Sequence, residues 1–261
     1  MDKEKLTDEE LEKLVLEAQR EAIEQKENEQ KKRNKRFSKL FISFVAFCLF
    51  LNTIAFLPET FSLPAIQFLK TSAQLSTRSD IQQYKQAVVA IASGNSRGTG
   101  FSIASDGTIL TNYHVIDEHD KVIVSFPKQG PYEAHIIETY PHIDLAVLQV
   151  ETTENHFPYL TLAEKADSLT DNDDVIFIGN PIRFHGIANR GTLIGTTKLH
   201  SWDEEVGMIR ASVYRGNSGS PVINNSGEVI GVIFATFEHE TYGNVGLFIP
   251  IEWFHNEQSK N

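Results

Sequence analysis

The clearest candidate for a chemically active residue in this chain is a serine in a glycine-rich turn. Ser218 lies in the segment 215–221 (RGNSGSP), directly before the apolar pair Val222 and Ile223. Glycine permits backbone conformations with φ > 0, which can direct neighbouring N–H groups to one point. We expect the N–H groups of Gly216 and Ser218 to hold the oxyanion of a tetrahedral intermediate of acyl transfer. A serine hydroxyl is a weak nucleophile, so this chemistry also needs a base and a group that orients the base.

A candidate base and a candidate orienting acid precede the serine. His114 follows the apolar run in the segment 108–116 (TILTNYHVI), and Asp144 stands just before the apolar residues of 142–148 (HIDLAVL). In a catalytic triad Ser218 would attack a carbonyl, and His114 would take its proton and later donate it to the leaving amine. Asp144 would hold the histidine tautomer and stabilise the imidazolium.

Each motif taken alone has a commoner structural interpretation, as a turn, a structural histidine or a cap. Two other acids, Asp117 and Asp120, are alternative orienting groups for His114. They follow the histidine by only three and six residues, which gives poor reach back to the ring, and we interpret them as turn residues. The joint order His, Asp, Ser, each at the end of a strand-like run, favours the triad.

The chain resembles trypsin-like serine proteases of the HtrA/Deg type, in the S1 peptidase superfamily. The resemblance rests on the segments 98–103 (GTGFSI), 110–116 (LTNYHVI), 144–148 (DLAVL), 178–181 (IGNP), 191–194 (GTLI), 215–221 (RGNSGSP) and 246–250 (GLFIP). Many short strand-like runs separated by turn signals already indicate an all-β fold. The resemblance implies a trypsin/chymotrypsin-like pair of six-stranded antiparallel β-barrels, at about 83–160 and 161–255. His114 and Asp144 would lie on the first barrel and Ser218 on the second.

The chain departs from the family's pattern in two ways. The family usually carries PDZ domains after the protease, and here we expect none, because only a few residues follow the closing strand. Ser220 stands where many members have glycine, an ending shared with secreted glutamate-specific proteases of Gram-positive bacteria. Those enzymes bind the substrate carboxylate with a histidine, and the matching position here is Ile233. Glutamate specificity is therefore not expected.

We expect the substrate pocket to be lined by Ser212, Ile233, Phe234 and Ala235. Ser212 lies in the region that walls the S1 pocket of trypsin-like folds, where an acid would select basic side chains. No acid stands there, so the pattern favours a small or medium apolar P1 residue. The histidines form no metal-binding pair such as His-Glu-x-x-His, and neither a metal nor an organic cofactor is expected.

The residues before the barrels divide into three expected parts. These are a charged helical segment at 1–36, a transmembrane helix at 37–57 and a juxtamembrane linker at 58–80, followed by the protease domain at 81–255. The stretch 37–57 is apolar with Lys39 as its one charge, and about 20 apolar residues span a bilayer.

The basic cluster 31–36 (KKRNKR) precedes the apolar stretch, and the far side lacks a matching cluster. The positive-inside rule then places the N-terminus in the cytoplasm and the protease domain outside the membrane. A cleaved signal peptide is the alternative. Its charged n-region would be unusually long, and no A-x-A cleavage site follows the apolar run.

Composition narrows the function further. The net charge of −11 argues against a nucleic-acid partner, and a single cysteine, Cys48, fits a bacterial cell surface. We expect a single-pass, membrane-anchored serine endopeptidase that cleaves extracytoplasmic proteins or peptides through an acyl-enzyme at Ser218. The alternative is a latent or inactive protease-fold module with a chaperone-like, binding or signalling role at the membrane. A homo-oligomer is left open, because members of this family are often trimers.

Overall fold

The structure is a computed structural model of the 261-residue chain. It describes residues 20, 39, 41, 43–50, 63–116, 121–153, 156–164, 171–181, 184–200, 202 and 204–260. The chain divides into two units, Met1–Ser62 and Leu63–Asn261. The alternative acids Asp117 and Asp120 lie outside the described residues.

The first unit covers the segments for which the sequence predicts a charged helix and a membrane span. Of the segment 1–36 only Arg20 is described, and of the stretch 37–57 residues 39, 41 and 43–50 are described, all of them helical. Among the described residues, no helix has both the length and the hydropathy that a membrane crossing needs. The transmembrane helix therefore remains a prediction.

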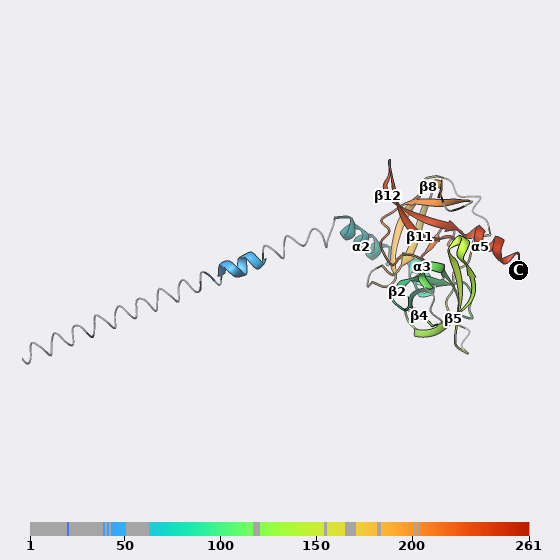
Figure 1. The fold of residues 1–261 in the computed structure, drawn as a ribbon, viewed down its shortest axis with the longest axis horizontal. Coiled ribbons are helices and arrows are strands. Elements are labelled where there is room, and N and C mark those ends of the chain that lie inside the picture. Colours follow the sequence, from blue (N-terminus) through green and yellow to red (C-terminus); the bar gives the residue numbers. More distant parts are fainter. Residues whose placement is uncertain are drawn as a thin grey trace, which may run out of the picture. The chain divides into compact units, whose positions relative to one another are not determined.

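The second unit is built from two closed antiparallel β-barrels of six strands each, which confirms the predicted all-β fold (Figure 1). The first barrel contains β1 (Val88–Ser93), β2 (Ser96–Ser102), β3 (Thr108–Asn112), β4 (Val122–Phe126), β5 (Gly130–Tyr140) and β6 (Leu145–Val150), in the order β1-β2-β3-β6-β5-β4. The second contains β7 (Asp174–Gly179), β8 (Ile187–Lys198), β9 (Glu205–Arg210), β10 (Pro221–Ile223), β11 (Val229–His239) and β12 (Gly243–Pro250), in the order β10-β11-β12-β9-β8-β7.

Apolar side chains join the two barrels as well as filling them. Phe101 and Leu110 of the first barrel belong to the same buried cluster as Phe177 and Val222 of the second. A separate cluster fills the rest of the first barrel, with Ile109 fully buried in it. Because burial of apolar surface is the main force that holds such layers together, the shared cluster fixes one barrel against the other.

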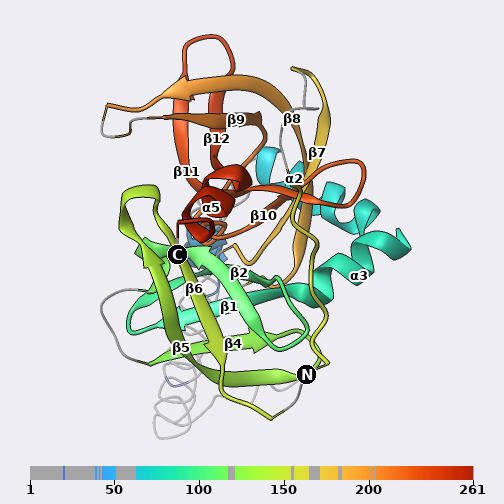
Figure 2. The same cartoon turned by 90° about the vertical axis from the view of Figure 1, so that its right-hand side faces the viewer.

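Short helices complete the second unit. The one-turn helix α4 (Tyr113–Ile116) follows β3, the 3-10 turn η1 (Pro141–Ile143) precedes β6, and α5 (Ile251–Gln258) follows β12. In Figure 2 α5 lies where the two barrels meet. The helix α3 (Ser79–Ala87) leads into β1, where the sequence already indicated a short helix.

The segment predicted as a juxtamembrane linker contains a helix, which corrects the expectation for 58–80. Helix α2 (Leu63–Leu75) packs against β8. Its Phe68 is buried, and the Phe68 carbonyl accepts a hydrogen bond from Asn189 Nδ2 at 3.3 Å. Pro64 does not prevent this helix, because a proline in the first turn has no intrahelical N–H bond to lose.

Candidate active site

His114 and Asp144 are brought together by neighbouring strands. Strand β3 ends at Asn112, which pairs with Leu145 at the start of β6. The turn after β3 carries His114, and the turn before β6 carries Asp144, so residues 30 positions apart in sequence meet. His114 Nδ1 lies 2.7 Å from Asp144 Oδ2. Since the carboxylate accepts this bond, Nδ1 carries the proton and Nε2 is left as the basic nitrogen.

Asp144 is held in place by its main chain as well as by its carboxylate. It has the left-handed conformation, with φ of 52°, which places its carbonyl and carboxylate toward the turn at α4. The carbonyl accepts bonds from Tyr113 N–H and Asn112 Nδ2, both at 3.0 Å. The carboxylate also accepts the His114 N–H at 2.9 Å. The Asp144 side chain is 15% exposed and that of His114 47% exposed, so the acid is the more shielded partner.

An ion pair flanks the turn that carries Asp144. His142 Nε2 lies 3.2 Å from Glu257 Oε1 on α5, and Lys260 Nζ lies 2.7 Å from the same oxygen. The hydrogen bond from Lys260, followed by that from His142, holds the pKa of Glu257 below its ordinary value of 4.5. The C-terminal helix is thereby tied to the η1 turn.

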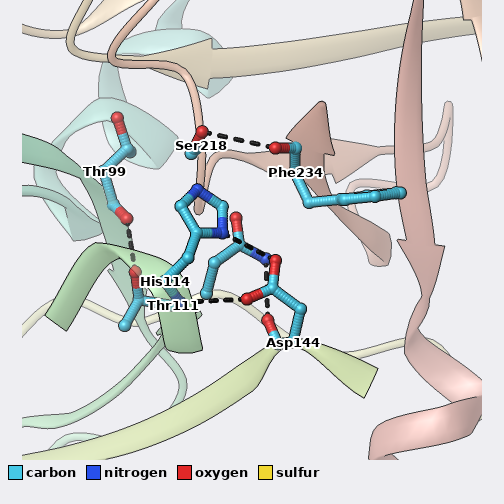
Figure 3. A network of polar contacts seen from close by, with 7 residues as sticks. Thr99, Thr111, His114, Asp144, Ser218 and Phe234 are labelled. Atoms are coloured by element: carbon cyan, nitrogen blue, oxygen red, sulfur yellow. Dashed lines mark hydrogen bonds and ion pairs between the residues drawn. The ribbon is translucent and has the colours of Figure 1, made fainter. Parts of the chain in front are cut away.

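Ser218 lies in a turn whose backbone is fixed by hydrogen bonds. Gly216 and Gly219 have φ of 98° and 85°, values that favour glycine. The Gly219 N–H donates to the carbonyl of Ile233 at 2.8 Å. The Ser218 hydroxyl donates to the carbonyl of Phe234 at 3.4 Å. Figure 3 shows the His114 ring between Asp144 and Ser218.

Thr99 of β2 holds the carbonyl groups of this turn. Its Oγ1 donates to Gly216 O at 2.7 Å, and its N–H donates to Ser218 O at 2.8 Å. Thr99 Oγ1 also accepts the Asn180 N–H at 2.9 Å. Within the described part of the chain, the N–H groups of Gly216 and Ser218 donate to no protein acceptor. The two groups expected to bind an oxyanion are thus available to an external oxygen.

The underside of the turn contains buried polar groups. Asn217 and Ser220 are fully buried. Among the described residues, neither the side-chain amide of Asn217 nor the hydroxyl of Ser220 has a hydrogen-bond partner. Gly179 lies against both, and a Cβ at that position would collide with Ser220 Oγ and Asn217 Oδ1. The turn therefore carries uncompensated polarity, which usually costs about 1–3 kcal/mol per group.

A cavity of about 220 Å³ adjoins Ser218. Two predicted pocket residues, Ile233 and Ala235, line it together with Val213, Tyr214, Arg215, Ser218 and Thr236. The other two predictions are corrected. Phe234 lies at an irregularity of β11 between Ile233 and Ala235. Its ring stacks on Trp202, with ring centroids 5.0 Å apart, and does not line this cavity. Ser212 lines a different cavity.

The pocket residues that sequence reasoning missed are Val213, Tyr214, Arg215 and Thr236. Arg215 directly precedes Gly216 in the serine motif, and that position was a usable signal. The others follow from how the 212–215 segment faces β11, which the sequence does not specify. No cluster of three or more potential metal ligands occurs among the described residues.

Comparison with known proteins identifies the family. The trypsin-like peptidase domain matches residues 98–232, more than half of the 261-residue chain. The chain belongs to the trypsin-like peptidase family. It is 35% identical over 158 residues to a probable periplasmic serine endoprotease DegP-like of Chlamydia trachomatis, covering 59% of this chain and 31% of that protein. It is 38% identical over 160 residues to the protein of the same name from Bartonella henselae, covering 59% and 30%.

Solved structures of this family agree with the fold. The Rv3671c protease in its inactive form aligns with a TM-score of 0.62 and 28% identity, covering 71% of this chain and 94% of that one. The serine endoprotease from Yersinia pestis aligns with a TM-score of 0.59 and 27% identity, covering 69% and 64%. The chain spans about a third of the length of the curated relatives it matches. These comparisons support an HtrA-type peptidase domain and the expected enzyme class, serine endopeptidase.

Proposed function

We propose that the chain hydrolyses peptide bonds of extracytoplasmic proteins through an acyl-enzyme at Ser218. His114 is the general base, Asp144 orients it, and the N–H groups of Gly216 and Ser218 stabilise the oxyanion. The observation that carries the proposal is the 2.7 Å bond between His114 Nδ1 and Asp144 Oδ2. With Nδ1 bound to Asp144, Nε2 is the ring nitrogen that can accept the proton of Ser218, and the ring lies beside Ser218 (Figure 3).

The reaction requires one side-chain movement. The Ser218 hydroxyl donates to Phe234 O, and it must turn to donate to His114 Nε2 before attack. The bond to Phe234 is long at 3.4 Å, and rotation between staggered χ1 positions breaks no other contact of this hydroxyl. Catalytic hydrogen bonds are often loose without substrate and tighten when it binds.

The small cavity beside Ser218 supports the proposed specificity. Val213, Ile233 and Ala235 give it an apolar wall, and a volume of about 220 Å³ suits a side chain of small or medium size. A residue such as valine or alanine at P1 would bury its apolar surface there. Arg215 is the charged residue of the lining.

The proposed location also rests on relatives. The DegP-like relatives are named periplasmic, and the stretch 37–57 has the composition of a membrane anchor. We place the N-terminus in the cytoplasm and the barrels outside. Extraction of bacterial membranes with alkaline carbonate tests the anchor: the full chain should stay in the pellet, and a variant lacking 37–57 should be released.

Cleavage of an unfolded protein tests the activity. The full chain is incubated with reduced, fluorescein-labelled casein and compared with Ser218→Ala and Ser226→Ala. Ser218→Ala should lower the rate by roughly 10⁴–10⁶-fold. Ser226 is exposed in the turn between β10 and β11, and Ser226→Ala should keep activity within a few-fold. Equal activity in Ser218→Ala and the wild type would overturn the proposal, and a folded but inactive wild type would favour the binding or chaperone-like alternative.

A further inference from the structure

A second and larger cavity lies away from Ser218, between α2 and the strands β8 and β9. Its volume is about 680 Å³, within the range of pockets that bind ligands. Three arginines line it, Arg78, Arg190 and Arg210, and none of its described lining residues is acidic. This concentration of positive charge is notable in a chain of net charge −11.

Two of these arginines have no acidic partner. Arg78 is paired with Asp80, with Nη2 at 2.5 Å from Oδ2. Arg190 and Arg210 form no ion pair within the described part of the chain, although both are exposed. Asp174 pairs with Thr192 across the β7–β8 ladder, yet it makes no ion pair with either arginine. Two guanidinium groups are therefore free to bind an incoming anion.

The strand register places these two guanidinium groups on one face. Arg210 pairs with Thr192 across the β8–β9 ladder, and Arg190 lies two residues before Thr192 on β8. Side chains two residues apart on a strand share a face, and cross-strand and diagonal neighbours are within reach of long side chains. Arg210 Cζ also lies 6.0 Å from the centre of the Tyr242 ring. This contact limits the conformations of its side chain before any ligand binds.

We propose that this cavity binds an acidic peptide segment. The planar fork of arginine matches a carboxylate with two parallel hydrogen bonds, and two free forks on one face suit successive acidic side chains. The cavity is too large for a single small anion. Phe68 and Leu75 add apolar surface, and Gln74 and Asn244 add amides that can bond a peptide backbone.

Neighbouring residues of the chain line this cavity and the cavity beside Ser218. Ser212 lines the arginine cavity, and its neighbour Val213 lines the cavity at Ser218. Phe68 of α2 packs edge-on against Tyr214, with ring centroids 4.7 Å apart, and Tyr214 also lines the cavity at Ser218. Residues 212–214 therefore contribute to the walls of both cavities. The binding claim itself does not depend on catalysis.

Peptide binding to the full-length Ser218→Ala chain tests this inference without cleavage. The probe is fluorescein-labelled Gly-Glu-Glu-Glu-Glu-Gly, and the matched probe has glutamine in place of each glutamate. Fluorescence anisotropy should show binding of the glutamate peptide alone. Adding both Arg190→Gln and Arg210→Gln to the Ser218→Ala chain should weaken binding of the glutamate peptide at least about tenfold, or by about 1.4 kcal/mol.

A second pair of substitutions controls for charge. Arg97→Gln with Lys128→Gln removes the same two charges from the first barrel and should change the dissociation constant less than about twofold, because exposed charges at a distance are screened. Arg190→Lys with Arg210→Lys, which keeps the charge but not the fork, should give an intermediate loss. Thermal melting verifies that each variant is folded.

Three results would overturn the inference. One is equal weakening by the two glutamine pairs, which would indicate attraction to the whole surface. Another is equal binding of the glutamate and glutamine probes. The third is no binding of the glutamate peptide while vesicles with anionic lipids, or inorganic phosphate, do bind through Arg190 and Arg210. That result would assign the arginines to a different anion.

Discussion

The two halves of the site are built in different ways. On the first barrel Asp144 is joined to the turn at His114 by four hydrogen bonds, two to its carboxylate and two to its carbonyl. On the second barrel the turn around Ser218 relies on two glycines with positive φ, and buried polar groups of Asn217 and Ser220 lack partners. The base is held by hydrogen bonds within its own barrel, whereas the nucleophile turn also needs two glycines in a conformation that other residues rarely adopt.

The second half also borrows its support from the first. Thr99, on β2, donates to the carbonyls of both Gly216 and Ser218. The nucleophile turn therefore depends on the contact between barrels, while the His114–Asp144 pair is complete within one barrel. We call the His114–Asp144 pair the base half and the turn around Ser218 the nucleophile half. We expect changes to the base half to affect chemistry more than folding, and changes to the nucleophile half to affect both.

Asp144→Asn should have a large effect on chemistry through the base alone. The amide presents a donor to His114 Nδ1, so the ring adopts the wrong tautomer. The rate of peptide hydrolysis should fall on the order of 10⁴-fold, as in trypsin-like triads, while the melting temperature changes little. Asp106→Asn is the control. The Asp106 carboxylate accepts a hydrogen bond from the Thr108 N–H in a turn, and this variant should leave the rate unaltered. A loss of less than tenfold at Asp144 would mean that the base half does not orient the base.

Gly219→Ala should break the nucleophile half. Its φ is 85°, and the new Cβ would collide with the Thr99 carbonyl. Strain and overpacking together should lower the free energy of unfolding by about 2–4 kcal/mol, measured by urea titration. Gly130→Ala is the control, because φ is 95° there but nothing lies within 4 Å. It should cost only about 1–2 kcal/mol, and equal losses would show that the turn is not tightly packed.

Thr99→Val should sharpen the comparison, because it removes the link between the halves while keeping the side-chain volume. The Gly216 carbonyl and the Asn180 N–H would both lose their partner, at a cost of about 1–3 kcal/mol. The rate of acylation of Ser218 should fall about tenfold or more, followed with an ester substrate in stopped flow. Thr99→Ser keeps the hydroxyl and should stay within a few-fold, and an equally slow serine variant would point to lost packing instead.

Glu257→Gln should have the smallest effect on the rate, since the ion pair it removes includes neither His114 nor Asp144. Peptide hydrolysis should change less than about twofold. The pKa of Glu257 is lowered, so its contribution to stability is present above pH 4.5 and is lost as the pH falls through the folded-state value. The wild type should lose stability more steeply than Glu257→Gln below pH 4.5. Glu252→Gln on the same helix is the control, and identical acid profiles for all three would show that the pair stabilises nothing.

The strand-like runs predicted an all-β fold, and the family resemblance predicted the two barrels. The positions of His114, Asp144 and Ser218 could be predicted because each lies in a short motif beside a strand. It did not predict Thr99 as the link, because that contact depends on how β2 meets the turn of the other barrel. The arginine cavity was missed for a similar reason, since only strand register brings Arg190 and Arg210 to one face. Helix α2 was read as a linker because two prolines precede or begin it.

Covalent labelling tests the central claim most directly. The full chain is treated with a fluorophosphonate, and the modified residue is located by mass spectrometry of its peptides. The account predicts one adduct, on Ser218, which is lost in Ser218→Ala and forms far more slowly in His114→Ala. A folded chain that takes no adduct, or takes it on another serine, would contradict a competent nucleophile and oxyanion site at this turn.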